Sequence, residues 1–452
     1  MSNTVLIMSD EHNPLVASPY GHPMVQTPHM ERLAREGTLF ENAYCPSPLC
    51  LPSRAAFMAG KRVHQIQTYN NSNACLCPDH PSFGRVLGDG GVHTAYIGKV
   101  DVYDVGANLG FSEMLLEQDR GFPGDTNVCR SPLQIREGAR KRAAGYGPKP
   151  NAGGGDERVV ERAVQWLNTT AQELDQPWLL CIMIVNPHFP HYVTQDLWDM
   201  YPDGGDLPAC GPEHPLAEHP FARDLRDHFE TDHFSEKDRR GLRRGYLGCV
   251  THVDRQIGRV VDALQRTGLR DATNVVYTSD HGDMLGKFGM WWKCSLYEDS
   301  VRVPLLASGP DFDRDKRVRT SVDLLDVQAT LFDTFGVDRP EDWSGTSLRS
   351  IAPNDPEHVT FAEYHGHGTR ASAYMVRKGA WKLIYCVDAP NLLFDLDSDP
   401  GETSDAIAVF PGKAAELEGE LRQICDPESE SARADGFISE QLAEMARRSK
   451  EK

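Results

Sequence analysis

The sequence predicts an α/β fold in which helices sandwich a large mixed, mostly parallel sheet, followed by a smaller C-terminal subdomain of antiparallel sheet plus helix. Strand-like and helix-like segments alternate from Thr4 to about Gly336, as in sheets covered on both faces. From about Pro353 the segments become short strands. A chain of 452 residues also exceeds the size that one hydrophobic core supports. We therefore expect a large α/β domain over residues 1–352 and a small domain over residues 353–452.

Apolar, partly β-branched runs predict the strands, and apolar residues at helical spacing predict the helices. In the large domain we expect strands at Thr4–Ser9, Trp178–Val185 and Asn274–Ser279. We expect helices there at Asp156–Leu167, at Glu236–Thr267 with an interruption near Gly245, and at Val322–Phe335. In the small domain we expect strands at Val359–Tyr364, Tyr374–Lys378 and Lys382–Cys386, and a helix at Pro411–Cys425.

Three further segments are predicted from their composition. The Gly- and Pro-rich stretches Gly145–Gly155 and Pro202–Pro220 favour loops, which we expect to rim a substrate pocket. The tail Asp426–Lys452 is charged and predicted to be partly helical. In a homo-oligomer, such a tail would pack on a partner subunit.

The composition excludes several classes of protein. Hydrophobic residues make up 40% of the chain, but no run approaches the roughly 18–20 apolar residues of a membrane span. The 66 acidic residues outnumber the 47 basic ones, and the net charge of −19 disfavours nucleic acid and, less firmly, long sulfated polymers as partners. The start Met1-Ser2-Asn3 lacks the basic stretch of a signal peptide, which favours a cytoplasmic location, with a trimmed leader as the alternative.

The cysteines give no disulfide or zinc pattern. The chain has 11 of them, scattered along its length, and in a chain this long they are predicted to be mostly reduced core thiols. The pair Cys75 and Cys77 has no second pair nearby, so it is a poor zinc site.

Two of the predicted strands end in residues that suit a divalent cation. Asp10-Glu11 follows Thr4–Ser9, and Asp280-His281 follows Asn274–Ser279. Open α/β sheets place ligands at the carboxyl ends of their strands. Carboxylate oxygens favour Ca or Mg, and one imidazole also admits Mn. Either pair alone is more often a solvated strand end, but the two pairs together with Cys50 predict one cation site.

A cysteine motif lies between these two strands in the sequence. Cys50-Leu51-Pro52-Ser53-Arg54 opens a short apolar helix candidate that ends at Gly60. Arg54 lies about one helical turn after Cys50, so its guanidinium can lie beside the same side chain. By itself the segment also fits a buried structural cysteine, because Pro and Ser are common at helix starts. The motif resembles the C-x-P-S-R signature of the formylglycine-dependent (type I) sulfatases, a family of the alkaline phosphatase superfamily.

Other segments resemble motifs of the same family in the same order along the chain, from about residue 3 to residue 405. They are Thr27–Thr38, Gly98-Lys99, Asn186–Pro190 with its P-H-x-P loop, Trp292-Lys293, Tyr297–Leu305, Arg377–Lys382 and Leu393–Glu402. The resemblance implies an alkaline phosphatase-like fold and a sulfuric ester hydrolase that releases inorganic sulfate from a small organic or sugar sulfate.

The resemblance also implies the active-site chemistry. A formylglycine-generating or anaerobic maturation enzyme would oxidise Cys50 to formylglycine, whose hydrate is the nucleophile. The implied cation is one divalent ion, Ca first and Mn or Mg as alternatives. Its implied ligands are Asp10, Glu11, residue 50, Asp280 and His281. The implied catalytic residues are Cys50, Arg54, Lys99, Asp101, His188 and Lys293. The implied substrate-binding residues are Asn71, Lys99, His188 and Lys293.

Two positions depart from the family pattern. Glu11 replaces a residue that is more often Asp or Gln, and Asp101 replaces the histidine of G-K-x-H. Asp101 would accept the proton when sulfate leaves, or would pair with Lys99 or Arg54, or would bind a substrate hydroxyl; His64 is a further candidate for the base. The G-K-x-D segment and Asn70-Asn71 resemble one subgroup, arylsulfatase K, a glucuronate 2-sulfatase, and this subgroup implies a uronate 2-O-sulfate as substrate.

Two other functions remain open from the sequence. A phosphonate monoester or phosphodiester hydrolase on the same scaffold would share the nucleophile and the Asp-His pair. A non-catalytic binding protein on a decayed scaffold is disfavoured, because the nucleophile, the cation ligands and the lysines are all present.

Overall fold

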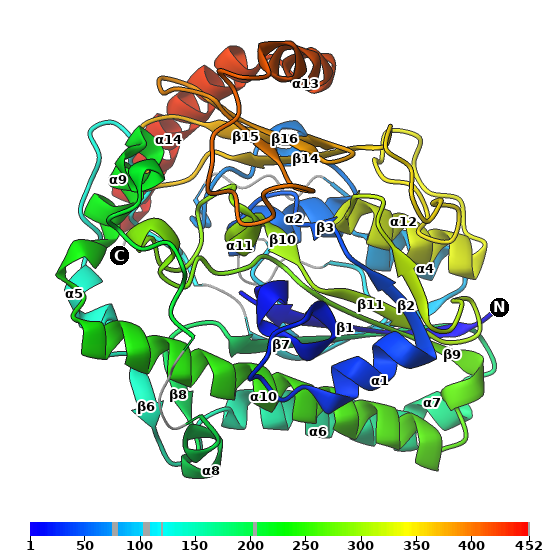
Figure 1. The fold of residues 1–452 in the computed structure, drawn as a ribbon. Coiled ribbons are helices and arrows are strands. Elements are labelled where there is room, and N and C mark those ends of the chain that lie inside the picture. Colours follow the sequence, from blue (N-terminus) through cyan, green and yellow to red (C-terminus); the bar gives the residue numbers. More distant parts are fainter. Residues whose placement is uncertain (75–79, 103–108, 119–120, 202–205, 451–452) are drawn as a thin grey trace.

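The computed structural model describes residues 1–74, 80–102, 109–118, 121–201 and 206–450 (Figure 1). Its largest sheet has eight strands in the order β12-β2-β11-β9-β1-β7-β4-β5. These strands are β12 (Lys316–Val318), β2 (Gly37–Phe40), β11 (Leu305–Ser308), β9 (Thr273–Ser279), β1 (Asn3–Asp10), β7 (Trp178–Pro187), β4 (His93–Lys99) and β5 (Glu113–Gln118). The pairs β9-β1, β1-β7, β7-β4 and β4-β5 are parallel, whereas β11 runs antiparallel to β9 and β2. The predicted mixed, mostly parallel sheet is confirmed.

Helices cover both faces of this sheet (Figure 1). One face carries α1 (Pro28–Glu36), α6 (Gly154–Asn168) and α10 (Glu236–Arg266), and the other carries α2 (Cys50–Ala59), α4 (Phe83–Asp89) and α12 (Leu324–Phe335). Alternate side chains of β1 feed the two cores, because successive residues of a strand point to opposite faces. Val5 and Ile7 pack with the first group of helices, and Leu6 and Met8 pack with the second.

A separate antiparallel sheet follows in the chain. It consists of β14 (Val359–Tyr364), β15 (Ala373–Lys378), β16 (Trp381–Cys386) and β17 (Leu392–Asp395) in sequence order. Helix α13 (Pro411–Ile424) packs on it through Leu417 and Leu421. The predicted C-terminal sheet and helix are confirmed, and the domain boundary at residues 352 and 353 stays a prediction.

The tail forms one continuous helix, α14 (Pro427–Lys450), rather than a partly helical segment. It packs on its own chain through one face, and the expectation that it also packs on a partner subunit stays a prediction. Gln441 Oε1 accepts a hydrogen bond from Asn70 Nδ2 at 2.7 Å. Arg433 Nε donates to Tyr69 Oη at 2.8 Å, and Asp435 pairs with the buried Arg130. The helix therefore fixes the segment that precedes Asn71.

The interruption expected in the long helix near Gly245 is wrong, since α10 runs unbroken over 31 residues. Gly245 lies where strand β8 (His191–Val193) crosses the helix. A Cβ atom at this position would approach His191 O to 2.3 Å. The glycine thus serves close packing between helix and strand rather than a break.

The helix expected at Val322–Phe335 begins two residues late because Asp323 is its N-cap: Asp323 Oδ1 accepts from Leu325 N at 2.8 Å. The predicted loop at 145–155 contains a short strand and the first two residues of α6. The remaining short elements are β3 (Ala43–Tyr44), β6 (Tyr146–Pro148), β10 (Arg302–Val303), β13 (Val322–Asp323), α3 (Val63–Ile66), α5 (Ala139–Arg142), α7 (Thr170–Glu173), α8 (Gln195–Asp199), α9 (Pro220–Phe229) and α11 (Glu298–Val301).

Nine cysteines lie in the described part of the chain, and all nine are free thiols, as expected. Cys75 and Cys77 lie outside the described residues. None of the helices that the structure describes is both long enough and apolar enough to cross a membrane.

Candidate active site

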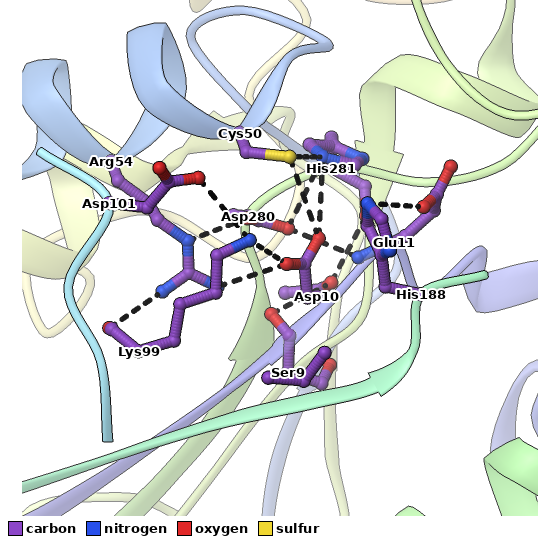
Figure 2. Close-up of polar contacts among 12 residues, drawn as sticks. Ser9, Asp10, Glu11, Cys50, Arg54, Lys99, Asp101, His188, Asp280 and His281 are labelled. Carbon is purple, nitrogen blue, oxygen red and sulfur yellow. Dashed lines mark hydrogen bonds and ion pairs between the residues drawn. The ribbon is translucent and has the colours of Figure 1, made fainter. Parts of the chain in front are cut away.

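Strands β1 and β9 and helix α2 bring the central residues of the predicted site together at one edge of the large sheet (Figure 2). Strands β1 and β9 run side by side in register, with Ser9 opposite Ser279, so the residues that follow them are neighbours. Glu11 then leaves the strand in a left-handed conformation, with φ 68°, which is strained for a residue with a side chain. Its backbone is held by Asp280 Oδ1, which accepts from Glu11 N at 3.1 Å, and by Tyr246 Oη, which donates to Glu11 O at 2.7 Å.

Cys50 is the first residue of α2 and is fully buried at the centre of this group. Its Sγ lies 3.1 Å from Lys293 Nζ, 3.3 Å from His281 Nε2 and 3.9 Å from Asp10 Oδ1. Burial by itself would raise the pKa of the thiol, but Lys293, Lys99 and His281 hold the pKa well below its ordinary value. An anionic atom at residue 50 is therefore stabilised by its surroundings.

The residues predicted to hold a cation form two overlapping groups. Ligand atoms of Asp10, Cys50, Asp280 and His281 all lie within 4.8 Å of one another, and so do those of Asp10, Glu11 and His188. Burial raises the pKa of Asp280, and the like charge of Asp10 raises it further, although the nearby Arg54 opposes both. Glu11 Oε1 is buried and accepts no hydrogen bond from the described residues. Crowded, incompletely satisfied carboxylates of this kind fit a bound divalent cation.

Arg54 and Lys99 flank the carboxylates on the side away from Glu11 (Figure 2). Arg54 Nε donates to Asp280 Oδ2 at 2.7 Å, and Lys99 Nζ contacts Asp10. Asp101 Oδ2 lies 3.4 Å from Lys99 Nζ, so the predicted Lys99–Asp101 pair is present. Arg54 Nη2 is buried and has no hydrogen-bond partner among the described residues. It is thus a donor available to an anion.

His188 and Lys293 form the other flank. Both reach the same oxygen of Glu11: Lys293 Nζ lies 3.2 Å and His188 Nε2 lies 3.3 Å from Glu11 Oε2. His188 Nδ1 lies 2.7 Å from the carbonyl oxygen of Phe189. Because a carbonyl only accepts, Nδ1 carries a hydrogen, and Nε2 faces the site.

A cavity of about 180 Å³ opens beside this cluster. It is lined by Leu49, Asn71, Asp125, Arg136, Arg142, His188, Phe189, Phe229, Trp292, Lys293, Cys294 and His367. Three predicted substrate-binding residues, Asn71, His188 and Lys293, are in this lining. Asn71 Oδ1 also accepts a hydrogen bond from Leu51 N at 3.0 Å, at the start of α2. A larger cavity of about 480 Å³ is lined by none of the predicted site residues.

Sequence reasoning missed part of this pocket and misplaced its rim. Neither 145–155 nor the described part of 202–220 contributes to the cavity lining, so the prediction that they rim the pocket is not supported. Asp125, Arg136, Arg142 and His367 do contribute. They come from irregular segments and short elements, which carry no periodic signal. His64, the other candidate base, instead bonds through Nδ1 to Glu363 at 3.0 Å.

The geometry agrees with what comparison to known proteins finds. A model of the family described as sulfatase matches residues 2–337, and one described as N-sulphoglucosamine sulphohydrolase, C-terminal, matches residues 286–424. The chain belongs to the sulfatase family. It is therefore a sulfuric ester hydrolase, as the motifs around Cys50 imply.

Individual sulfatases align over most of the chain. Arylsulfatase K of Xenopus laevis is 30% identical and covers 98% of this chain and 86% of its own length. Choline-sulfatase of Rhizobium meliloti (strain 1021) is 31% identical and covers 89% of this chain and 82% of its own length. A solved phosphonate monoester hydrolase of Agrobacterium radiobacter superposes with a TM-score of 0.75 at 21% identity, covering 96% of each chain. This last likeness shows the shared fold.

Proposed function

We propose that this sulfatase hydrolyses the sulfate ester of a small organic or sugar alcohol, with formylglycine at residue 50 and one divalent cation. The observation that supports the proposal most is the position of Cys50 Sγ, 3.1 Å from Lys293 Nζ and 3.3 Å from His281 Nε2 at the edge of the carboxylate cluster. This sulfur atom stands in for an oxygen of the formylglycine hydrate. Formylglycine would supply two hydroxyls on one carbon, one to attack sulfur and one to let sulfate leave.

The residues fit a cation on the same side of residue 50. Asp10, Asp280, His281 and residue 50 would hold it, with Glu11 able to complete the set. A divalent cation would supply positive charge that lowers the pKa of the attacking hydroxyl and neutralises a sulfate oxygen. The mostly oxygen donors favour Ca, whereas the imidazole keeps Mn, besides Mg, as an alternative.

The chain's own cations would stabilise the sulfate as the ester bond breaks. Arg54, Lys99 and Lys293 surround residue 50 and Asp10. Fixed donors of this kind each typically contribute roughly 2–4 kcal/mol to transition-state stabilisation. His188 Nε2, assisted by Lys293, would donate a proton to the leaving oxygen. Asp101 would accept the proton released from residue 50 when sulfate departs.

The charge of the chain and the likeness to two relatives support two candidate substrates. A net charge of −19 opposes long polyanions, while the local lysines and arginine attract one small anion. The likeness to arylsulfatase K supports a uronate 2-O-sulfate as one candidate, and the likeness to a choline-sulfatase supports a small alcohol sulfate as another. A maturation enzyme that oxidises Cys50 is the expected protein partner. A cytoplasmic location and a homo-oligomer stay predictions.

A phosphonate monoester or phosphodiester hydrolase is the second candidate, since a phosphonate monoester hydrolase shares the fold. To separate the two, the chain is produced together with a maturation enzyme and given an aryl sulfate and the matching aryl phosphodiester and phosphonate monoester. Preferred release of sulfate supports the proposal, whereas preferred hydrolysis of a phosphorus ester contradicts it.

Two variants and a control test the nucleophile in the same assay. Cys50→Ala and Cys50→Ser should lose multiple turnover, with the Ser protein checked by mass because some maturation enzymes oxidise serine. Cys249→Ala removes a buried thiol in α10 and should keep the wild-type rate. Normal turnover by Cys50→Ala would overturn the proposal.

A further inference from the structure

Arg142 lies in the wall of the active-site cavity without a carboxylate partner. It is the last residue of the short helix α5, and its side chain is partly buried. Its Cζ atom lies 4.3 Å from the ring centroid of Phe189, 5.3 Å from that of Trp292 and 5.7 Å from that of Phe229. These three rings form an aromatic cage around the guanidinium. Among the described residues, none makes a hydrogen bond or ion pair with its side chain.

The neighbouring Arg136 shows how the charge of an arginine in this cavity can be balanced by a carboxylate. Arg136 Nη2 pairs with Asp125 Oδ2 at 2.7 Å, and its Nη1 lies 3.2 Å from His367 Nε2. Lys293, on the other side, has Glu11 as its partner. Of these three cations in the lining, Arg142 is therefore the one whose charge no carboxylate balances at close range.

This arrangement is costly unless a ligand completes it. Burial and the like charge of Arg136 together lower the pKa of Arg142 to about 10, against the opposing charges of Glu11 and Asp125, and the guanidinium stays charged at neutral pH. Contacts with ring faces offset part of the lost hydration. They use the guanidinium's π system, however, and leave its N–H donors for an acceptor.

The reaction centre lies close by. Lys293 Nζ lies 5.6 Å from the centroid of the same Phe189 ring and 3.1 Å from Cys50 Sγ. The cation beside the nucleophile and Arg142 therefore contact the same aromatic ring. A substrate whose sulfate reaches residue 50 would present a group a few bonds from the ester to Arg142.

We propose that Arg142 is a specificity-determining residue that binds a second anionic group on the sulfated substrate. This inference rests on the proposed function, because it assigns the other end of the same substrate. A carboxylate matches the guanidinium fork through two hydrogen bonds, and a second sulfate offers the same charge. A cationic alcohol such as choline is disfavoured, because Arg142 already occupies the aromatic cage that would receive it and repels it.

The test compares substrates that differ in one charge. The mature protein is given each of four substrates, and the release of sulfate yields kcat/KM for each one. The substrates are a sulfated methyl glucuronoside, its carboxyl methyl ester, the corresponding disulfated glucoside and choline sulfate. The same substrates are given to Arg142→Met, which removes the charge, and to Arg142→Lys, which keeps it. Arg140→Met is the matched control, because Arg140 lies on the same helix, largely exposed and paired with Glu230.

We expect the wild-type chain to favour the acid over its methyl ester by roughly 10-fold or more, the usual range for a charged hydrogen-bonded contact. The ratio of kcat/KM for the acid to kcat/KM for its methyl ester should fall toward one in Arg142→Met. It should persist in part in Arg142→Lys and stay unchanged in Arg140→Met. A preference for the disulfated sugar instead of the acid would assign the second group as sulfate.

Three results would overturn the inference: a wild-type preference for choline sulfate, rates on the acid and on the disulfated sugar that are no higher than on the methyl ester, or a preference for the second anionic group that Arg142→Met leaves unchanged. An aryl sulfate assayed in parallel distinguishes a failure of the Arg142 inference from a failure of the proposed function. If the aryl sulfate is hydrolysed but the ratio fails, only the role of Arg142 is wrong. If the mature protein releases sulfate from none of these compounds, the proposed function is wrong and the inference falls with it.

Discussion

At the scale of single residues, the candidate site is a balance of buried charges around position 50. The carboxylates of Asp10, Glu11 and Asp280 are fully buried. Lys99, Lys293 and Arg54 lie against them. Burial by itself would lower the pKa of His281, but Asp280 raises it to about 9, so the imidazole is cationic at neutral pH while no cation competes for it. A bound cation would displace that proton, which couples cation binding to proton release.

Removing one carboxylate should weaken the binding of the divalent cation. Asp280→Asn deletes a charge from the group of four ligand atoms, and we expect roughly a 10-fold or greater loss of affinity for Ca. After a chelator has removed bound cations, adding Ca should raise the melting temperature of both proteins, but the variant should need a higher Ca concentration for the same rise. Excess Ca should also restore part of the variant's rate of sulfate release. Asp271→Asn, at an exposed position in the turn Arg270–Ala272 that precedes β9, is the control and should titrate like wild type. Equal titrations for Asp280→Asn and wild type would count against the site.

Asp101 can be tested through the time course of the reaction. If Asp101 accepts the proton when sulfate leaves, Asp101→Asn should show a burst of product followed by slow turnover, with a sulfated residue 50 detectable by mass. Its contact with Lys99, 3.4 Å from Nζ to Oδ2, permits a second role. A variant with a raised KM and no burst would make Asp101 a positioning residue. Unaltered kinetics on every substrate would remove it from the site.

At the scale of elements, the site exists because two parallel strands, β1 and β9, end at the place where helix α2 begins. The register that pairs Ser9 with Ser279 brings Asp10 beside Asp280. Ser53, in the first turn of α2, donates to Asp280 O at 2.6 Å and ties the helix start to β9. The position of Cys50 therefore depends on backbone geometry on both sides.

Close packing of α10 against β8 gives a prediction at this scale. A methyl group at Gly245 would lie 2.3 Å from His191 O, so Gly245→Ala should destabilise the fold by about 1–3 kcal/mol. Gly419→Ala in α13, where a Cβ meets nothing within 4 Å, is the matched control and should stabilise by roughly 0.5–1 kcal/mol. Thermal unfolding of both variants checks this; a Gly245→Ala protein as stable as wild type would contradict it.

Particular residues show which parts of the fold and of the candidate site can be predicted from the sequence. Asp10, Asp280 and Cys50 are predictable because strand ends and a helix start are local features that converge by the rules of parallel sheets. Gly245 is misjudged because its reason, the approach of His191, comes from a part of the chain 54 residues earlier. Arg142 and His367 are missed because tertiary contacts alone bring them to the cavity. The run from Arg136 to Arg142 resembles an ordinary solvated basic segment in sequence.

At the scale of the whole molecule, the small sheet is joined to the large domain by a buried polar network. Glu363 on β14 accepts from His64 Nδ1 at 3.0 Å and lies 2.8 Å from His365 Nε2. Burial by itself would raise the pKa of Glu363, but His64 and His365 hold the pKa well below its usual 4.5. This carboxylate is fully buried, so its loss would leave both histidines without their partner.

The network predicts how stability depends on pH. Because the folded-state pKa lies below the unfolded value of 4.5, the carboxylate stabilises the fold above about pH 4.5, and this contribution is lost as the pH falls below that value. Glu363→Gln should be less stable than wild type at pH 7 by roughly 1–3 kcal/mol. The difference should shrink as the pH is lowered from 5 to 3. Urea unfolding across that range is the measurement, and a constant difference would contradict the prediction.

The central claim is that residue 50 acts as formylglycine rather than as cysteine. Preparations made with graded amounts of a maturation enzyme will differ in the fraction of chains whose residue-50 peptide carries the lighter aldehyde in place of the thiol. Both the aldehyde fraction, by mass spectrometry, and the rate of sulfate release are measured for each preparation. We predict that the rate rises in proportion to the aldehyde fraction and extrapolates to zero for chains with cysteine alone. Multiple turnover by a preparation whose residue 50 is entirely cysteine would contradict the account.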